Sequence, residues 1–189
     1  MITNYKIILA SKSPRRRELL EGLNLPFDVI IHEVDETFPE GLPIEDIPVY
    51  LAKLKAEPYY KELDIDTLVI TADTIVCIDG MVLGKPNDYE HAAVMLRQLS
   101  GKKHLVVTGV CLTAKDKQVA FSASTNVYFK NLSEGEINYY LKNFQPYDKA
   151  GSYGVQEWIG FIAIERIEGS YFNVMGLPVQ QLYEELIKF

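Results

Sequence analysis

Segments with β-strand composition alternate with segments of helical pattern along the chain, and tight-turn signals join some of the strands directly. Alternating strands and helices are typical of an α/β protein, whereas a hairpin signal such as Asp79-Gly80 gives an antiparallel pair. The sequence therefore predicts a mixed β-sheet flanked by helices and not a purely parallel sheet. We expect strands at 5–10, 27–34, 67–78, 81–83, 105–113, 119–129 and 158–167, and helices at 13–24, 43–63, 88–99, 133–144 and 178–187.

Two of these helices carry clear capping signals at their first residue. Ser13 precedes Pro14, and serine is a favoured N-cap while proline suits the first helical position. Ser133 stands three residues before Glu136, which is the spacing of a capping box. By contrast, two prolines inside the 43–63 stretch must bound or kink that helix. These signals predict where the chain enters its helices.

The composition indicates one soluble globular unit. The chain has 189 residues, 48% of them hydrophobic, with no internal repeat, low-complexity tract or Ser/Gly linker, so we expect a single domain over 1–189. Nineteen Lys and Arg against 26 Asp and Glu give a net charge of −7. Proteins that coat a polyanion are usually basic, so we expect neither nucleic-acid binding nor anionic-membrane binding.

The targeting and redox signals favour a cytoplasmic protein. The apolar stretch near the start covers only residues 7–10, which is too short for a signal peptide, and no apolar run approaches the roughly 20 residues that span a bilayer. Cys77 and Cys111 each lie inside an apolar run without metal-ligand spacing, so two buried thiols are expected.

The first candidate site is the segment 11–17, Ser-Lys-Ser-Pro-Arg-Arg-Arg, which opens a helix. A helix N-terminus favours negative charge, yet this first turn holds three arginines. Backbone N–H groups, the hydroxyls of Ser11 and Ser13 and the guanidinium groups of Arg15 and Arg16 together suit a phosphate. A solvated basic turn is the alternative. Charge alone leaves the two readings about even, and the rigid Ser-x-Ser-Pro entry favours the anion site.

The second candidate is Asp73, which interrupts the apolar stretch 68–78. A carboxylate in such a strand must be paired, hydrogen-bonded or bound to a metal. It could act as a general base for water or as a Mg²⁺ ligand, or it could be a structural aspartate held by neighbouring threonines and amides. We favour a functional role because buried unpaired charges are rare and costly.

Weaker signals come from two lysines and one loop. Lys55 lies in a helical stretch, and Lys85 leaves a hairpin through a rigid proline turn. The glycine-rich loop 148–156 ends on Gln156, whose amide presents both a donor and an acceptor and so suits a nucleobase edge. Taken alone, each is better explained as an ordinary surface lysine or turn. The sequence also lacks GxSxG, HExxH and GxGxxG motifs, so serine-hydrolase, zinc-protease and dinucleotide-binding classes have no support.

Taken together, these segments resemble the Maf family. The resemblance covers nearly the whole chain, from Ile8 to Leu186, and its motifs occur in the order seen in that family. They are LASKSPRRRELL, VDETFPE, LAKLKAE, ITADTIV, LGKPND, LSGKKHLVVTGV, YDKAGSYGVQ and GSYFNVMGLP. Maf proteins are similar in fold to inosine triphosphate pyrophosphatases. The resemblance implies an elongated mixed α/β sheet, two lobes and a deep cleft between them.

The same resemblance implies the activity. Maf proteins look like nucleoside triphosphate pyrophosphatases, which cut between the α- and β-phosphates with a divalent metal, Mg²⁺ or Mn²⁺. The physiological nucleotide could be a modified pyrimidine removed as housecleaning. A homodimer is common in the family and is an open expectation here. The alternative is a non-catalytic nucleotide-binding regulator, because the family name is tied to inhibition of septum formation.

Residue by residue, Asp73 matches the family's proposed proton acceptor. As a hypothesis for the mechanism, we expect Asp73 and Glu36 to hold the divalent metal. Arg15, Thr74 and Gln156 match positions that discriminate substrates. The remaining matches are polar positions lining the cleft, namely Glu36, Lys55 and Lys85.

The Tyr-Gly-x-Gln context of Gln156 resembles the branch that acts on dTTP and UTP, whereas the branch acting on 7-methyl-GTP has a Ser-Glu type sequence there. The chain departs from many relatives at Glu157-Trp158, where glycine usually follows the glutamine. A bulky tryptophan beside the base reader is expected to narrow the pocket, which leaves the preference among pyrimidines open.

Overall fold

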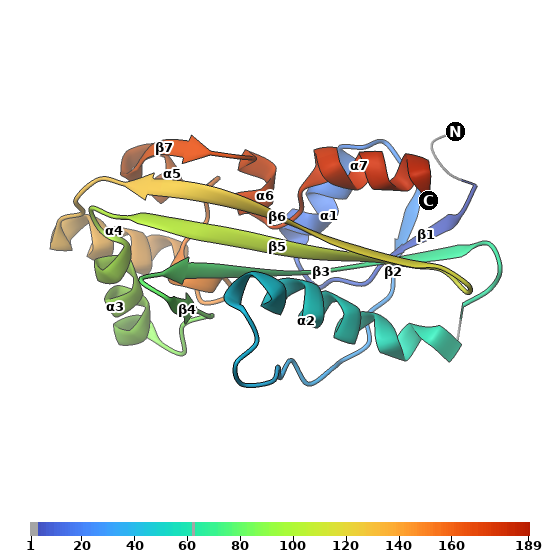
Figure 1. The fold of residues 1–189 in the computed structure, drawn as a ribbon. Helices are drawn as coiled ribbons and strands as arrows, with labels where there is room; N and C mark the ends of the chain where they lie inside the picture. The colour runs from blue at the N-terminus through green and yellow to red at the C-terminus, as the bar shows by residue number, and fades with distance from the viewer. Residues whose placement is uncertain (1–3, 62) are drawn as a thin grey trace. The chain divides into compact units, whose positions relative to one another are not determined.

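The computed structural model describes residues 4–61 and 63–189 and has an α/β architecture (Figure 1). Its strands are β1 (Lys6–Leu9), β2 (Phe27–Val29), β3 (Thr67–Ile78), β4 (Met81–Leu83), β5 (Lys103–Thr113), β6 (Gln118–Phe129) and β7 (Ile164–Glu168). Within the described residues they form a seven-stranded sheet in the order β2-β1-β3-β5-β6-β7, with β4 paired to β3. Strand β1 is parallel to β2 and β3, whereas the β3–β4 and β6–β7 pairs are antiparallel. The predicted mixed sheet is confirmed.

The helices begin where the capping signals indicate. Ser13 Oγ accepts the backbone N–H of Arg16, and the capping box between Ser133 and Glu136 forms both of its bonds. The α-helices are α1 (Pro14–Glu21), α2 (Ile47–Ala56), α3 (Tyr89–Leu99), α4 (Glu134–Phe144), α5 (Trp158–Ala163), α6 (Tyr171–Met175) and α7 (Val179–Lys188). Short 3₁₀ turns cover Ile44–Asp46, Glu57–Lys61 and Ala150–Ser152.

Four segments differ from the sequence prediction. Strand β2 ends at Val29, well before residue 34, and α6 was not foreseen. The predicted strand 158–167 is wrong in its first half, which forms α5 before the chain becomes β7. A short apolar run has no periodicity that separates helix from strand, so the error has a simple cause. The predicted helix 43–63 is a 3₁₀ turn, α2 and a second 3₁₀ turn, and Glu62 lies outside the described residues.

The chain divides into two compact units, neither of which is a continuous segment. The first comprises Met1–Asp73, Thr108–Ala123 and Gly176–Phe189, and the second comprises Thr74–Val107 and Ser124–Met175. The cleft expected between two lobes stays a prediction. No helix in the described ranges is long and apolar enough to cross a membrane. Cys77 and Cys111 are both buried, as expected of two apolar thiols.

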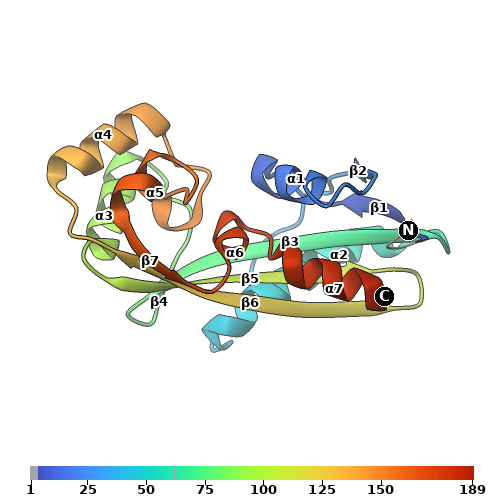
Figure 2. The same cartoon turned by 90° about the horizontal axis from the view of Figure 1, so that it is seen from above.

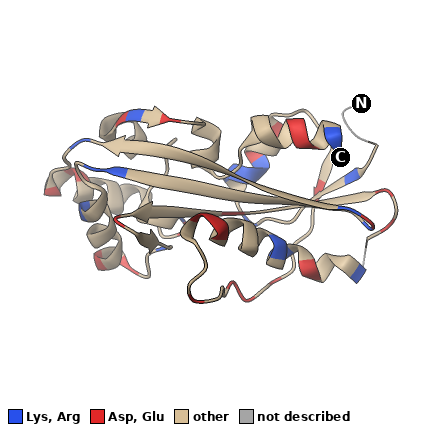
Figure 3. Cartoon of the chain, viewed as in Figure 1, with Lys and Arg blue, Asp and Glu red and all other residues tan. Residues whose placement is uncertain are grey.

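In the first unit, a close approach at Gly109 of β5 determines where α2 lies. A Cβ atom at Gly109 would stand 2.2 Å from the carbonyl carbon of Pro48, so a larger residue there would push α2 away. Buried Ala52 and Ala56 line the helix on the packed side, next to Cys111 of β5. Figure 3 shows that α2 also carries basic residues in its last turn, where they complement the helix dipole.

In the second unit, α3 and α4 lie side by side in both views (Figures 1 and 2). Arg97 of α3 forms two hydrogen bonds with Glu134 of α4, each 2.8 Å long, and the Tyr89 hydroxyl bonds to Asn138. Tyr140 of α4 is fully buried. The Tyr140 hydroxyl bonds to Gly154 and Glu157, so α4 contacts the loop at 148–157.

Candidate active site

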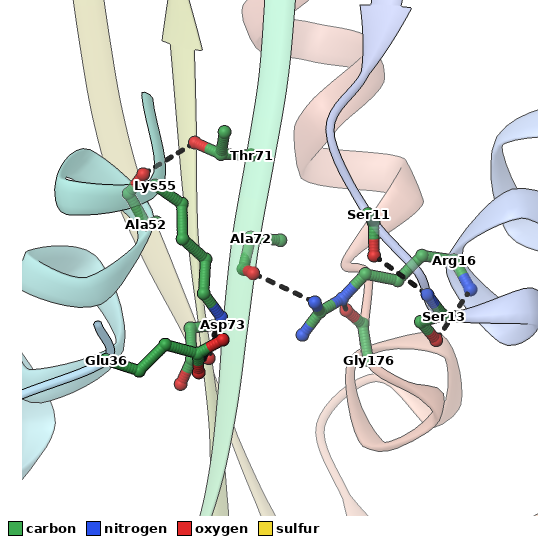
Figure 4. Close-up of polar contacts among 10 residues, drawn as sticks. All are labelled: Ser11, Ser13, Arg16, Glu36, Ala52, Lys55, Thr71, Ala72, Asp73 and Gly176. Carbon is green, nitrogen blue, oxygen red and sulfur yellow. Dashed lines mark hydrogen bonds and ion pairs between the residues drawn. The ribbon is translucent and has the colours of Figure 1, made fainter. Parts of the chain in front are cut away.

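Three of the charged residues singled out from the sequence meet on β3. Asp73 stands in the middle of that strand and is 8% exposed. The Lys55 ammonium donates a hydrogen bond to Asp73 Oδ1 at 2.6 Å and lies 3.0 Å from Glu36 Oε2 (Figure 4). The prediction that a carboxylate at this position must be paired is confirmed.

The local structure explains why Lys55 reaches Asp73. Side chains two residues apart in a strand point to the same face, so Thr71 and Asp73 both face α2. The Thr71 hydroxyl donates a 2.6 Å hydrogen bond to the carbonyl of Ala52, which fixes α2 against the strand. Lys55 follows Ala52 by three residues, about one helical turn, and so is presented next to Asp73.

The group carries one positive and two negative charges and is partly shielded from water. The side chains of Lys55 and Asp73 are 16% and 12% exposed, so salt screens their attraction less than at an open surface. Mg²⁺ in proteins is often held by one or two carboxylates together with substrate phosphates. Asp73 and Glu36 fit that pattern. Residues 4–61 and 63–189 contain no cluster of three or more metal-ligating side chains. Asp73 and Glu36 supply two carboxylates, a set that fits a metal shared with a phosphate.

Arg16 supports the same strand from the other side. Its Nε donates to the carbonyl of Gly176 and its terminal nitrogen to the carbonyl of Ala72, each at 2.8 Å. Figure 4 shows Arg16 and Lys55 reaching β3 from opposite sides. Strand β1 ends at Leu9, which pairs with Ile70. Beyond this last parallel pairing, the Arg16 guanidinium donates the hydrogen bond to the carbonyl of Ala72.

Charge also couples Arg16 to the carboxylates. Removal from water lowers the pKa of the Arg16 guanidinium, while the negative charges of Asp73 and Glu36 act in the opposite direction. A guanidinium stays protonated in proteins, so a fixed positive charge lies near Asp73. The sequence suggested a phosphate contact for Arg16, and the structure adds a role in fixing β3 and the start of the segment at Gly176.

The serines and Arg15 surround the first turn of α1. Ser11 Oγ accepts the backbone N–H of Ser13 at 3.2 Å, and Ser13 Oγ accepts that of Arg16 at 3.4 Å. A hydroxyl that accepts can still donate its own hydrogen, so both serines keep a donor for an anion. Arg15 is half-buried. Their predicted contact with phosphate stays a prediction.

The other predicted residues lie in the second unit. Thr74 follows Asp73 on β3, and Lys85 is exposed in the turn after β4. The backbone N–H of Gly151 donates to the carbonyl of Gly84 at 3.1 Å, which ties the loop carrying Gln156 to the lysine turn. Gln156 Oε1 is buried and has no hydrogen-bond partner within the described part of the chain.

Sequence reasoning missed the contacts of Glu157, which it noted only as a departure from relatives. Glu157 bonds to Tyr140, seventeen residues earlier, and to Lys149. No local sequence pattern connects these positions. The one signal that could have pointed to a role for Glu157 is its place directly after Gln156. Trp158, expected to narrow the pocket, packs on Tyr139 of α4 with ring centroids 4.7 Å apart.

Comparison with known proteins gives consistent matches. The family described as "Maf-like protein" matches residues 6–189. The "dTTP/UTP pyrophosphatase" of Porphyromonas gingivalis is 56% identical, covering 100% of this chain and 96% of that protein. Proteins of the same name from Phocaeicola vulgatus (99% and 97% covered) and Christiangramia forsetii (98% and 95%) are 56% and 48% identical. The solved Ham1 protein of Staphylococcus aureus has a TM-score of 0.55 at 16% identity, covering 96% of this chain and 97% of that one, which shows a shared fold.

Proposed function

The chain belongs to the Maf-like protein family, and we propose that it is a nucleoside triphosphate pyrophosphatase that hydrolyses dTTP and UTP. The products would be the nucleoside monophosphate and pyrophosphate. The observation that carries this proposal is the fixed carboxylate of Asp73, held in a strand by the Lys55 ammonium and set beside a second carboxylate. The name shared by relatives that match nearly the full chain supports the choice of substrate.

In the proposed reaction, a water molecule attacks the α-phosphorus and Asp73 accepts its proton. The bond from the α-phosphorus to the bridging oxygen breaks, and pyrophosphate leaves with the electron pair. Lys55 holds Asp73 in one orientation, and positioning of this kind supplies a large part of catalysis. Arg15 and the hydroxyls of Ser11 and Ser13 would bind phosphate oxygens, since cations and helix N-termini favour them.

We also propose that a divalent cation, Mg²⁺ or Mn²⁺, is held by Asp73 and Glu36 together with the nucleotide. When bound, such an ion would offset phosphate charge and make a bound water more acidic. Two carboxylates suit a site that is completed by substrate oxygens. Lys55 already lies between these carboxylates, so it would share them with the ion or turn towards a phosphate.

Gln156 is the proposed reader of the base. A buried carbonyl oxygen without a donor costs about 1–3 kcal/mol, and a ligand N–H that reaches it removes this cost. Uracil and thymine present an N3–H donor beside a carbonyl at C4, whereas cytosine presents an N3 acceptor beside a 4-amino donor. A glutamine amide whose oxygen accepts N3–H and whose nitrogen donates to O4 therefore fits the first pattern and not the second. An unpaired acceptor at Gln156 therefore supports a preference for the two bases that share this edge.

A panel assay tests the proposal. The purified protein is incubated with Mg²⁺ or Mn²⁺ and each of dTTP, UTP, CTP, GTP, ATP and 7-methyl-GTP, and the products are separated. We expect dTMP and UMP with pyrophosphate. Diphosphate with phosphate would contradict the cleavage position. Recovery of tightly bound, intact nucleotide would favour the non-catalytic regulator instead.

A substitution at Gln156 tests the base reader. Gln156→Ala should lower the preference for dTTP over dCTP, whereas Gln180→Ala, at an exposed position on α7, should not. An unchanged preference in Gln156→Ala would contradict the role. We further propose that the protein acts on cytoplasmic nucleotides and forms a homodimer. Size-exclusion chromatography with light scattering tests the homodimer.

A further inference from the structure

Glu157, directly after Gln156, uses both oxygens of its carboxylate within the second unit. Oε1 lies 3.0 Å from the Lys149 ammonium, and Oε2 accepts a hydrogen bond from the Tyr140 hydroxyl. The Lys149 side chain is 9% exposed and Tyr140 is fully buried. The carboxylate is therefore held at two points by partners that water barely reaches, where such bonds are strong.

The direction of these hydrogen bonds is fixed. Burial and the charge of Glu157 both raise the pKa of Tyr140, so its hydroxyl stays protonated and donates to the carboxylate. The hydroxyl oxygen in turn accepts the backbone N–H of Gly154 at 3.1 Å. Gly154 also packs tightly here, since a Cβ atom there would stand 2.9 Å from the carboxyl carbon of Glu157. Glu157 thus contacts the loop directly at Lys149 and, through the Tyr140 hydroxyl, at Gly154.

The loop between Lys149 and Gly154 needs such contacts because of its backbone conformation. Gly151 and Ser152 have φ angles of 67° and 60°, and the left-handed region is unfavourable for an ordinary L-residue such as Ser152. A strained conformation persists where surrounding contacts determine it. Glu157 contacts Lys149 on one side of Gly151 and Ser152 and, through Tyr140, Gly154 on the other side. Gly154 is only two residues before Gln156.

We propose that Glu157 is a positioning residue for base recognition, which holds the Gln156 amide where it can select uracil and thymine nucleotides through its bonds to Lys149 and Tyr140. The inference rests on the proposed function, because it assigns a consequence to the base-reading role of Gln156. A glycine after the glutamine offers no carboxylate, so this loop depends on a bond that such a sequence lacks.

The experiment compares kcat/KM for dTTP with kcat/KM for dCTP, which differ at the base and share the sugar and the triphosphate. Glu157→Gln removes the charge at constant shape, and Tyr140→Phe removes the hydroxyl at nearly constant shape. Each should lower the dTTP/dCTP ratio by roughly tenfold, the equivalent of one lost hydrogen bond, and should act mainly through the KM for dTTP. Glu136→Gln is the matched control, because Glu136 is also paired with a lysine in the same unit but caps α4.

A double variant separates positioning from general damage. If Glu157 acts through Gln156, Glu157→Gln should change the ratio little in a Gln156→Ala background. An equal drop in both backgrounds, or a folded Glu157→Gln protein with the wild-type ratio, would overturn the inference. If the wild-type protein hydrolyses neither nucleotide, the proposed function fails, and the same comparison is made with dissociation constants from calorimetry. A wild-type protein that also binds both nucleotides equally would overturn the inference as well.

Discussion

Lys55 of α2 donates a 2.6 Å hydrogen bond to Asp73 of β3, so the charged residue that interrupts an apolar strand has its partner on the helix packed against that strand. The same ammonium lies 3.0 Å from Glu36, which precedes α2. One lysine therefore organises two carboxylates that lie 37 residues apart in the chain. It can do so because Gly109 lets α2, the helix that carries Lys55, approach the sheet closely. The position of one helix sets the geometry of the candidate site.

Asp73→Asn should lower dTTP turnover by roughly 10²- to 10⁴-fold, because an amide cannot accept the proton of the attacking water. The fold should persist, since Lys55 keeps Glu36 as a partner. Steady-state kinetics with circular dichroism measures both effects. Asp88→Asn is the matched control, because asparagine caps α3 as well as aspartate does. An Asp73→Asn enzyme with wild-type turnover would refute the mechanism.

Lys55→Gln should reduce turnover at least tenfold and lower the free energy of unfolding by about 1–3 kcal/mol, because two carboxylates lose a shielded partner. Lys53→Gln, an exposed position in the same last turn of α2, should change neither quantity appreciably. Urea denaturation and dTTP kinetics provide the two readouts. Equal effects of the two substitutions would mean that Lys55 acts only through the charge of the helix end.

Arg16→Ala should lower the free energy of unfolding by about 2–4 kcal/mol, because the carbonyls of Ala72 and Gly176 each lose a donor. Arg17→Ala tests the neighbouring position, where an exposed ion pair with Glu21 contributes about 0.3–0.5 kcal/mol. Urea denaturation of both variants gives the difference. If Arg16→Ala proved as stable as Arg17→Ala, its two carbonyl bonds would have no net structural value.

The elements predicted correctly are those whose signals lie within a few residues. The hairpin at Asp79-Gly80 forms with φ angles of 51° and 78°, which are the positive values that favour this dipeptide in a two-residue turn. The caps at Ser13 and Ser133 are equally local. Asp73 was found for a related reason, since one charge inside an apolar strand is visible without any knowledge of its partner.

The features that sequence reasoning missed depend on tertiary contacts. The bond from Arg16 to Gly176 joins residues 160 positions apart, and the one from Tyr140 to Glu157 depends on how α4 packs against a loop. The apolar residues at 158–163 suit a strand as well as a helix, and the turn after Glu157 decides for α5. Propensity cannot supply these relations.

His104 should make the protein less stable at acidic pH. Burial lowers the pKa of its ring to about 3, from an ordinary value near 6.5, and the ring packs edge-on against Phe129 while Nε2 lies 2.7 Å from the Tyr153 hydroxyl. Below pH 6.5 the unfolded chain takes up a proton that the folded protein refuses until about pH 3. The stabilising contribution of the neutral His104 ring should therefore be fully present above pH 6.5. Between pH 6.5 and about 3, the free energy of unfolding should fall by about 1.4 kcal/mol for each pH unit.

His104→Gln removes the titrating group, so its free energy of unfolding should vary less with pH between 6 and 4 than that of the wild type, by about 1.4 kcal/mol per pH unit. Urea denaturation at several pH values measures the two slopes. His91→Gln, at an exposed position of α3, should reproduce the wild-type slope. Equal slopes for His104→Gln and the wild type would show that the buried ring is not the group that links folding to pH, because only a side chain whose proton affinity changes on folding can create that dependence.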